Sequence, residues 1–137
     1  MLLKLTNTKI KENFPDLTFE INNKDSSITI PAKIKEIGEL VIVDDKTELT
    51  VYIGSLTHCH FDCYEEYYSE SQKQEYIVES VIEFLIDLFN NEIVVWKYND
   101  SSGGFYYIEG NEAEQDTPIE DPMDNPKVEK YTWLKRY

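Results

Sequence analysis

The clearest pattern of hydrophobic positions in the chain lies between residues 70 and 89. Apolar side chains recur there at the three- and four-residue spacing of a buried helix stripe, at Ile77, Val78, Val81, Leu85, Leu88 and Phe89. The preceding Ser69-Glu70-Ser71-Gln72 has the spacing of a capping box, and Asn90-Asn91 suits the left-handed conformation that ends many helices. The sequence therefore predicts a helix over residues 70–89.

Shorter apolar pieces precede this helix and have the alternation of strands. They span residues 17–21, 28–30, 39–43 and 48 to about 61. The last two pieces flank the turn Asp44-Asp45-Lys46, so we expect them to pair as a hairpin. A short helix is expected over residues 5–14, because Pro15 restricts the residue before it.

After the long helix, residues 92–98 and 105–108 form a second pair of strand-like runs around a turn rich in Ser and Gly. Strands that follow one another through short turns favour antiparallel pairing. We predict an α+β fold: a single antiparallel sheet of about five to six short strands (two hairpins), covered on one face by the long helix, with a short N-terminal helix.

The chain divides by composition into three parts. Residues 1–108 form the predicted α+β domain. Residues 109–126 contain seven acidic residues, three prolines and no basic residue, so we expect an extended segment. Residues 127–137 are basic and aromatic, and we expect them to pack back on the domain.

Composition and charge narrow the function classes. The chain has 137 residues and a formal net charge of −14, with nine acidic residues against one basic residue in 62–92. Such a field repels nucleic acid and anionic membranes and attracts basic partners. No apolar run approaches the ~20 residues needed to cross a bilayer, and the N-terminus lacks the features of a secretory signal. We therefore expect a cytoplasmic protein.

The run Thr57-His58-Cys59-His60-Phe61-Asp62-Cys63 holds every histidine and cysteine of the chain. Its Thr-His-x-His-x-Asp spacing resembles the signature of the metallo-β-lactamase superfamily, which implies a hydrolytic zinc centre. That family draws further histidine ligands from later in the chain, and this sequence has none. A smaller metal site remains, because His58, His60 and Asp62 share one face of a strand.

The two cysteines fall on the opposite face of that strand, together with Phe61. If Cys59 and Cys63 lie on one strand, their Cα atoms are about 13 Å apart, beyond the ~7 Å limit for a disulfide. We expect two free thiols that behave as small apolar side chains.

Acidic residues alternate with tyrosines from the end of this run into the long helix. The helical part, Glu75, Glu79, Glu83 and Asp87, recurs every four residues, which brings like charges together. The upstream part comprises Asp62, Tyr64, Glu65, Glu66, Tyr67 and Tyr68. Acidic groups interleaved with tyrosines suit recognition of a basic protein surface.

Enzyme motifs are missing from the sequence. It has no nucleophile elbow, dinucleotide-binding loop or His-Glu-x-x-His, and Gly103-Gly104 lacks the lysine of a phosphate loop. We therefore expect neither catalysis nor a cofactor. The alternative is a small zinc-binding protein or metal-dependent enzyme using His58, His60 and Asp62.

The chain as a whole resembles the small, uncharacterised single-domain proteins of Gram-positive bacteria and, more loosely, the acidic immunity proteins that neutralise toxins. The segments that carry this resemblance are ITIPAK, the DDK hairpin, THCHF, and the capped helix running into FNNEIVVW. The resemblance implies a stoichiometric binder of a basic protein, without catalysis, that acts by occlusion and charge complementarity.

Overall fold

A helix opens the fold and ends shortly before a proline. In the computed structural model, which describes residues 2–99, 101–109 and 128–137, α1 spans Leu2–Asn13 and Pro15 follows. The helix begins three residues before the predicted start, because Leu2 and Leu3 are buried against the rest of the protein. Ile10 is buried on the same helix, so α1 contributes one apolar stripe to the core.

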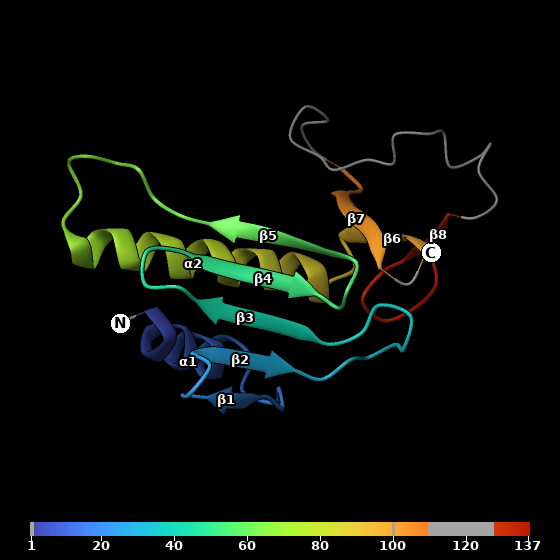
Figure 1. The fold of residues 1–137 in the computed structure, drawn as a ribbon, viewed down its shortest axis with the longest axis horizontal. Coiled ribbons are helices and arrows are strands. Elements are labelled where there is room, and N and C mark those ends of the chain that lie inside the picture. The colour runs from blue at the N-terminus through green and yellow to red at the C-terminus, as the bar shows by residue number, and fades with distance from the viewer. Residues whose placement is uncertain (1, 100, 110–127) are drawn as a thin grey trace.

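Five strands then form an antiparallel sheet in sequence order, β1-β2-β3-β4-β5 (Figure 1). Their bounds are β1 Glu20–Asn22, β2 Ser27–Ile30, β3 Leu40–Asp44, β4 Leu49–Ile53 and β5 Thr57–Phe61. The predicted hairpin between 39–43 and the run that starts at residue 48 is confirmed by the pairing of β3 with β4. The predicted class, α+β with antiparallel pairing, is also confirmed.

The run from Glu48 to Phe61 is two strands rather than the one predicted. The chain reverses at Gly54, whose φ of +53° suits glycine, and a Cβ there would lie 2.0 Å from the Ile37 carbonyl oxygen. The turn holds three residues and Ile53 pairs with Thr57, so β5 keeps the predicted alternation of its faces. Leu56 is buried in this turn.

The long helix matches its prediction at both ends. α2 spans Glu70–Phe89, and the Ser69 hydroxyl accepts a hydrogen bond from the Gln72 amide while Gln72 Oε1 accepts one from the Ser69 amide. Asn91 adopts a φ of 61° just beyond the helix end. These local signals set the two ends of α2.

The second hairpin does not join the first sheet, so the prediction of a single sheet is wrong. β6 (Ile93–Asn99) lies between β7 (Ser102–Tyr107) and β8 (Glu129–Tyr131) in a separate three-stranded sheet. The ring of Phe84 on α2 lies 5.6 Å from that of Phe61 and 5.4 Å from that of Phe105. Aromatic side chains therefore occupy the junction between β5 and β7.

Residues 128–137 complete this second sheet. β8 pairs with β6, and the buried Trp133 ring lies 5.6 Å from the ring of Phe89 at the end of α2. The C-terminal segment thus supplies a core side chain. The acidic segment expected over 109–126 lies outside the described residues except for Glu109.

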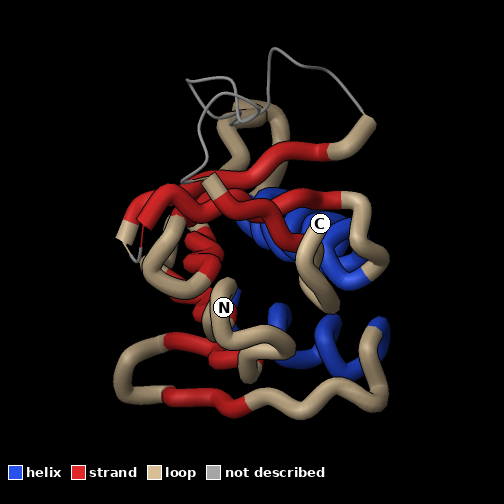
Figure 2. The backbone as a smooth tube through the Cα atoms, turned by 90° about the vertical axis from the view of Figure 1, so that its right-hand side faces the viewer, coloured by secondary structure: helices blue, strands red, loops and turns tan. Residues whose placement is uncertain are grey.

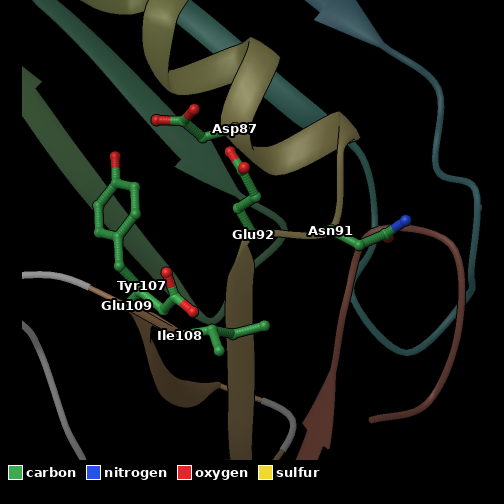
Figure 3. Close-up of a pocket in the computed structure, with 6 residues that line it drawn as sticks. All are labelled: Asp87, Asn91, Glu92, Tyr107, Ile108 and Glu109. Carbon is green, nitrogen blue, oxygen red and sulfur yellow. The ribbon is translucent and has the colours of Figure 1, made fainter.

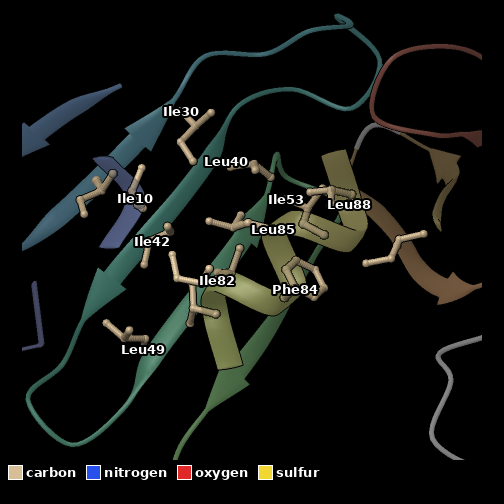
Figure 4. Packing of buried hydrophobic residues seen from close by; sticks show 14 of the residues in the cluster. Ile10, Ile30, Leu40, Ile42, Leu49, Ile53, Ile82, Phe84, Leu85 and Leu88 are labelled. Carbon is tan, nitrogen blue, oxygen red and sulfur yellow. The ribbon is translucent and has the colours of Figure 1, made fainter. Parts of the chain in front are cut away.

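One face of the five-stranded sheet forms the core. α1 contacts β2 and β3, while α2 contacts β4 and β5, and both helices lie on the same side of the sheet (Figure 2). The side chains that meet there include Ile10, Ile30, Leu40, Ile42, Leu49, Ile53, Ile82, Phe84, Leu85 and Leu88 (Figure 4). This arrangement leaves the other face of the sheet, and the outer side of α2, toward solvent. No helix in the described parts of the chain is long and apolar enough to span a membrane.

Candidate protein-binding surface

The loop between β5 and α2 presents tyrosines to solvent. Tyr64 is 84% exposed and Tyr67 is 95% exposed, with Glu65 and Glu66 between them. Asp62 shares a hydrogen bond with Tyr64, and this bond raises the pKa of the Tyr64 phenol. Exposed rings of this size have little packing role in the monomer, so the loop is a candidate contact surface.

The loop is joined to the first turns of α2 by an aromatic contact. The rings of Tyr68 and Tyr76 lie 6.4 Å apart in an edge-to-face arrangement, and both side chains remain partly exposed. Tyr76 lies between the acidic positions Glu75 and Glu79 in the sequence and extends the tyrosines of the loop onto the helix. The loop and the helix thus present one continuous set of tyrosines and carboxylates.

The acidic row on α2 turns around the helix instead of running straight along it. Each step of four residues advances about 40° beyond a full turn, so three steps rotate the row by about 120°. Glu75, Glu79 and Glu83 are exposed, whereas Asp87 is half-buried. The row therefore starts beside the tyrosine loop and ends beside β7 of the second sheet.

A cavity of about 450 Å³ lies at that end of the row. Its lining residues are Asp87, Asn91, Glu92, Tyr107, Ile108 and Glu109 (Figure 3). Figure 3 shows the carboxylates of Asp87 and Glu92 close to each other, across from the Tyr107 ring. Among the lining side chains that the structure describes, three are acidic and none is basic.

Asp87 raises the pKa of two other groups in this cavity. A hydrogen bond with Asp87 raises the pKa of Glu92, and desolvation and the charge of Asp87 add to the shift. Burial raises the pKa of Tyr107 to about 12, and the nearby Asp87 carboxylate adds to that shift. The cavity is therefore a place where negative charge is concentrated and unfavourable.

The sequence-based prediction did not include Glu92, Tyr107 or Glu109. The tight connection at Asn91 places Glu92 beside the end of α2, and the pairing of β6 with β7 brings Tyr107 opposite Ile93. A local signal was available: the last turn of α2 contains an acidic residue and no basic one. Helix dipoles favour the reverse arrangement.

We call the predicted contact residues, together with Tyr76, the acidic tyrosine surface. It comprises Asp62, Tyr64, Glu65, Glu66, Tyr67, Tyr68, Glu75, Tyr76, Glu79, Glu83 and Asp87. All are exposed except Asp62 and Asp87, which are partly buried. Their carboxylates and phenols can accept hydrogen bonds from lysine and arginine side chains.

The two histidines lie on the solvent face of β5, as the alternation predicts. The His58 and His60 rings are 4.9 Å apart, and the Tyr52 ring lies 5.4 Å from that of His58. His60 Nδ1 is 2.9 Å from the Thr50 hydroxyl and 3.1 Å from a carboxylate oxygen of Glu48. These contacts are those of a polar cluster on the open face of the sheet.

Asp62, the third predicted metal ligand, follows the end of β5 and contacts Tyr64. Among residues 2–99, 101–109 and 128–137, no three His, Cys, Asp or Glu side chains are grouped so that they could hold a metal ion. The structure therefore does not bring His58, His60 and Asp62 together as a ligand set.

Both cysteines are free thiols, as predicted, and are partly buried. Burial raises the pKa of the Cys59 thiol, which lowers the thiolate population at neutral pH. Cys63 packs against the hydrophobic core with Phe61. These environments suit packing more than nucleophilic chemistry.

Comparison with protein-family models, with curated proteins and with solved structures gives no match for this chain.

Proposed function

We propose that this protein is a non-catalytic binder of a basic protein partner and that it acts as an immunity-type neutraliser in the cytoplasm. The acidic tyrosine surface is the contact region. The partner is held in stoichiometric complex, and its activity is blocked by occlusion.

The observation that carries this proposal is the pair of almost fully exposed tyrosines at 64 and 67, flanked by carboxylates. Tyrosine offers a large, stiff ring with only two rotatable side-chain bonds, so its burial in a complex costs little conformational entropy. Aromatic residues are also enriched where interfaces draw most of their affinity.

The charges on α2 support the same proposal. The like-charge pairs along Glu75, Glu79, Glu83 and Asp87 each disfavour the helix by roughly 0.2–0.5 kcal/mol, and an acidic last turn adds to that cost. Glu75, Glu79 and Glu83 are exposed, and the side chains that α2 buries are apolar, so these three carboxylates lie outside the core. Local features that oppose stability are expected where a surface serves binding.

A basic partner relieves this repulsion when it binds. Its lysine and arginine side chains neutralise the carboxylates, while the long-range field of the acidic protein speeds their encounter. Because exposed charges are screened by salt, the association rate and the affinity both fall as ionic strength rises.

The test is capture of partners by the full chain from an extract of its source cells, with proteins quantified by mass spectrometry. We expect the proteins retained at low salt and released at high salt to be basic. A Tyr64→Ser/Tyr67→Ser variant, which keeps every charge, should retain them at least about tenfold less, because two interface anchors are lost.

The matched control is Tyr98→Ser/Tyr137→Ser, which removes two exposed tyrosines outside the acidic tyrosine surface. This variant should retain the same proteins as the wild-type chain. Equal losses in the two variants, or retention of mainly acidic proteins, would rule out the proposed contact region.

A further inference from the structure

β5 is an edge strand next to the acidic tyrosine surface. It is last in the order β1-β2-β3-β4-β5, and among the described residues its backbone ladder is formed with β4 alone. β7 approaches the start of β5, where Gly103 lies against Leu56, but β7 pairs with β6. Beyond this approach, no described strand other than β4 forms a hydrogen-bonded ladder with β5, and Tyr107 of β7 lies near Cys59.

This edge lacks the features by which proteins protect exposed strands. Such edges commonly carry charged residues or proline, or are very short. The opposite edge, β1, follows that rule, with three residues and a glutamate. The sequence of β5, Thr-His-Cys-His-Phe, is five residues long and contains neither proline nor a lysine, arginine or carboxylate.

Carboxylates flank the free part of β5 on both sides of the sheet. On the solvent side, Glu48 lies 3.1 Å from His60 Nδ1. On the core side, Asp87 of α2 lines the same cavity as Tyr107, and the charges of Asp87, Cys59 and Glu83 all raise the Tyr107 pKa. An added strand at this edge would therefore meet negative charge above and below its plane.

We propose that the basic partner adds an extended segment to the free edge of β5, from Cys59 to Cys63, by backbone hydrogen bonding. This inference rests on the proposed function and specifies its binding mode. Outward-facing amide and carbonyl groups supply the affinity of such strand addition, and side chains at alternate positions supply its specificity.

The geometry also sets the chemistry of the segment. Successive side chains of an added strand point alternately to the two faces of the sheet. One set meets Glu83 and Asp87 beside α2, and the other meets Glu48 on the open face. Lysine or arginine at every second residue places all the positive charges on one face, toward Glu83 and Asp87 or toward Glu48, and leaves β-branched residues for the other face.

The probe is the octapeptide Lys-Val-Lys-Thr-Lys-Val-Lys-Thr, added to the isotope-labelled full chain at low salt. We expect saturable binding and slower hydrogen exchange of outward-facing amides between residues 59 and 63. The control peptide Lys-Pro-Lys-Thr-Lys-Pro-Lys-Thr has the same charge, but its prolines remove two amide donors and oppose strand pairing. It should bind at least about tenfold more weakly.

Proline substitution in the protein provides the second variant. Neighbouring residues of a strand direct their amides to opposite edges, so one of Cys59 and His60 donates outward and the other toward β4. Exchange in the free protein identifies the outward amide as the faster one. Proline at that position, Cys59→Pro or His60→Pro, should leave the fold intact and reduce octapeptide affinity about tenfold.

Each outcome has a distinct meaning. Equal binding of the two peptides would overturn strand addition while leaving the proposed binding of basic partners standing. Absence of binding by both peptides would overturn strand addition, and the capture experiment with the Tyr64→Ser/Tyr67→Ser variant would then decide the proposed function separately. Dimerisation of the free chain that is lost in the outward proline variant would assign the edge to a second copy of the chain and overturn the inference.

Discussion

At the scale of single residues, two turn positions with positive φ differ in whether they can hold a side chain. Gly54 has a φ of +53°, which favours glycine, and it lies against the Ile37 carbonyl, which leaves no room for a Cβ. Lys46 has a φ of 85° in the exposed turn between β3 and β4, where a lysine is accommodated with strain. The sequence signalled a turn at Lys46 through its Asp-Asp-Lys composition, but a lone glycine within an apolar run did not reveal the reversal at Gly54.

Gly54→Ala should therefore destabilise the protein by about 1–3 kcal/mol, because the new Cβ meets the Ile37 carbonyl and the backbone is strained. Chemical denaturation measures the free energy of unfolding. As the counterpart, Lys46→Gly should be as stable as Lys46→Ala or more stable by up to about 1 kcal/mol, with net charge held equal. A neutral effect of Gly54→Ala would contradict the turn described for β4 and β5.

Tyr107 gives a prediction for alkaline pH. Its pKa rises from 10.0 to about 12 on folding because of burial and the nearby Asp87 carboxylate. The folded state thus favours the neutral phenol, so this stabilisation is complete below pH 10 and is lost as pH rises toward 12. The free energy of unfolding should fall less steeply over this range in Tyr107→Phe than in the wild-type chain. Identical slopes would place Tyr107 away from the acidic cavity.

At the scale of elements, α2 was predictable and the division into two sheets was not. The stripe, the capping box and the terminal asparagines of α2 are all local in sequence. The partition of the strands depends on Phe84, Phe61 and Phe105 meeting across three different elements. No local pattern encodes that meeting, nor the placement of Trp133 beside Phe89.

Ser69→Ala should cost about 1 kcal/mol of stability, since the Ser69 hydroxyl accepts the Gln72 amide at the start of α2. The first turn of α2 connects the tyrosine loop to Glu75 and Tyr76, and its amide exchange should also accelerate when the cap is lost. Ser71→Ala, two residues further along the same exposed turn, is the matched control and should change stability little. Equal effects of the two substitutions would show that the cap contributes nothing specific.

At the scale of the whole molecule, the net charge of −14 attracts any basic protein. A specific contact region requires in addition that the acidic tyrosine surface binds the partner better than other acidic parts of the protein. The sequence predicted which residues are acidic and exposed, because helical periodicity places them opposite the apolar stripe. It could not predict that the row turns toward Tyr107 and Glu92, since that depends on how the second sheet packs against α2. A specific contact region therefore depends on the position of the acidic residues as well as on their charge.

The most direct test compares two charge reversals that alter net charge equally. Glu79→Lys/Glu83→Lys changes the acidic tyrosine surface, and Asp16→Lys/Glu20→Lys changes exposed carboxylates near β1. The measurement is retention of basic proteins from the source-cell extract at fixed low salt. We predict at least about a tenfold loss for the first variant and wild-type retention for the second. Equal retention by the two variants would contradict a specific contact region and reduce the interaction to bulk charge.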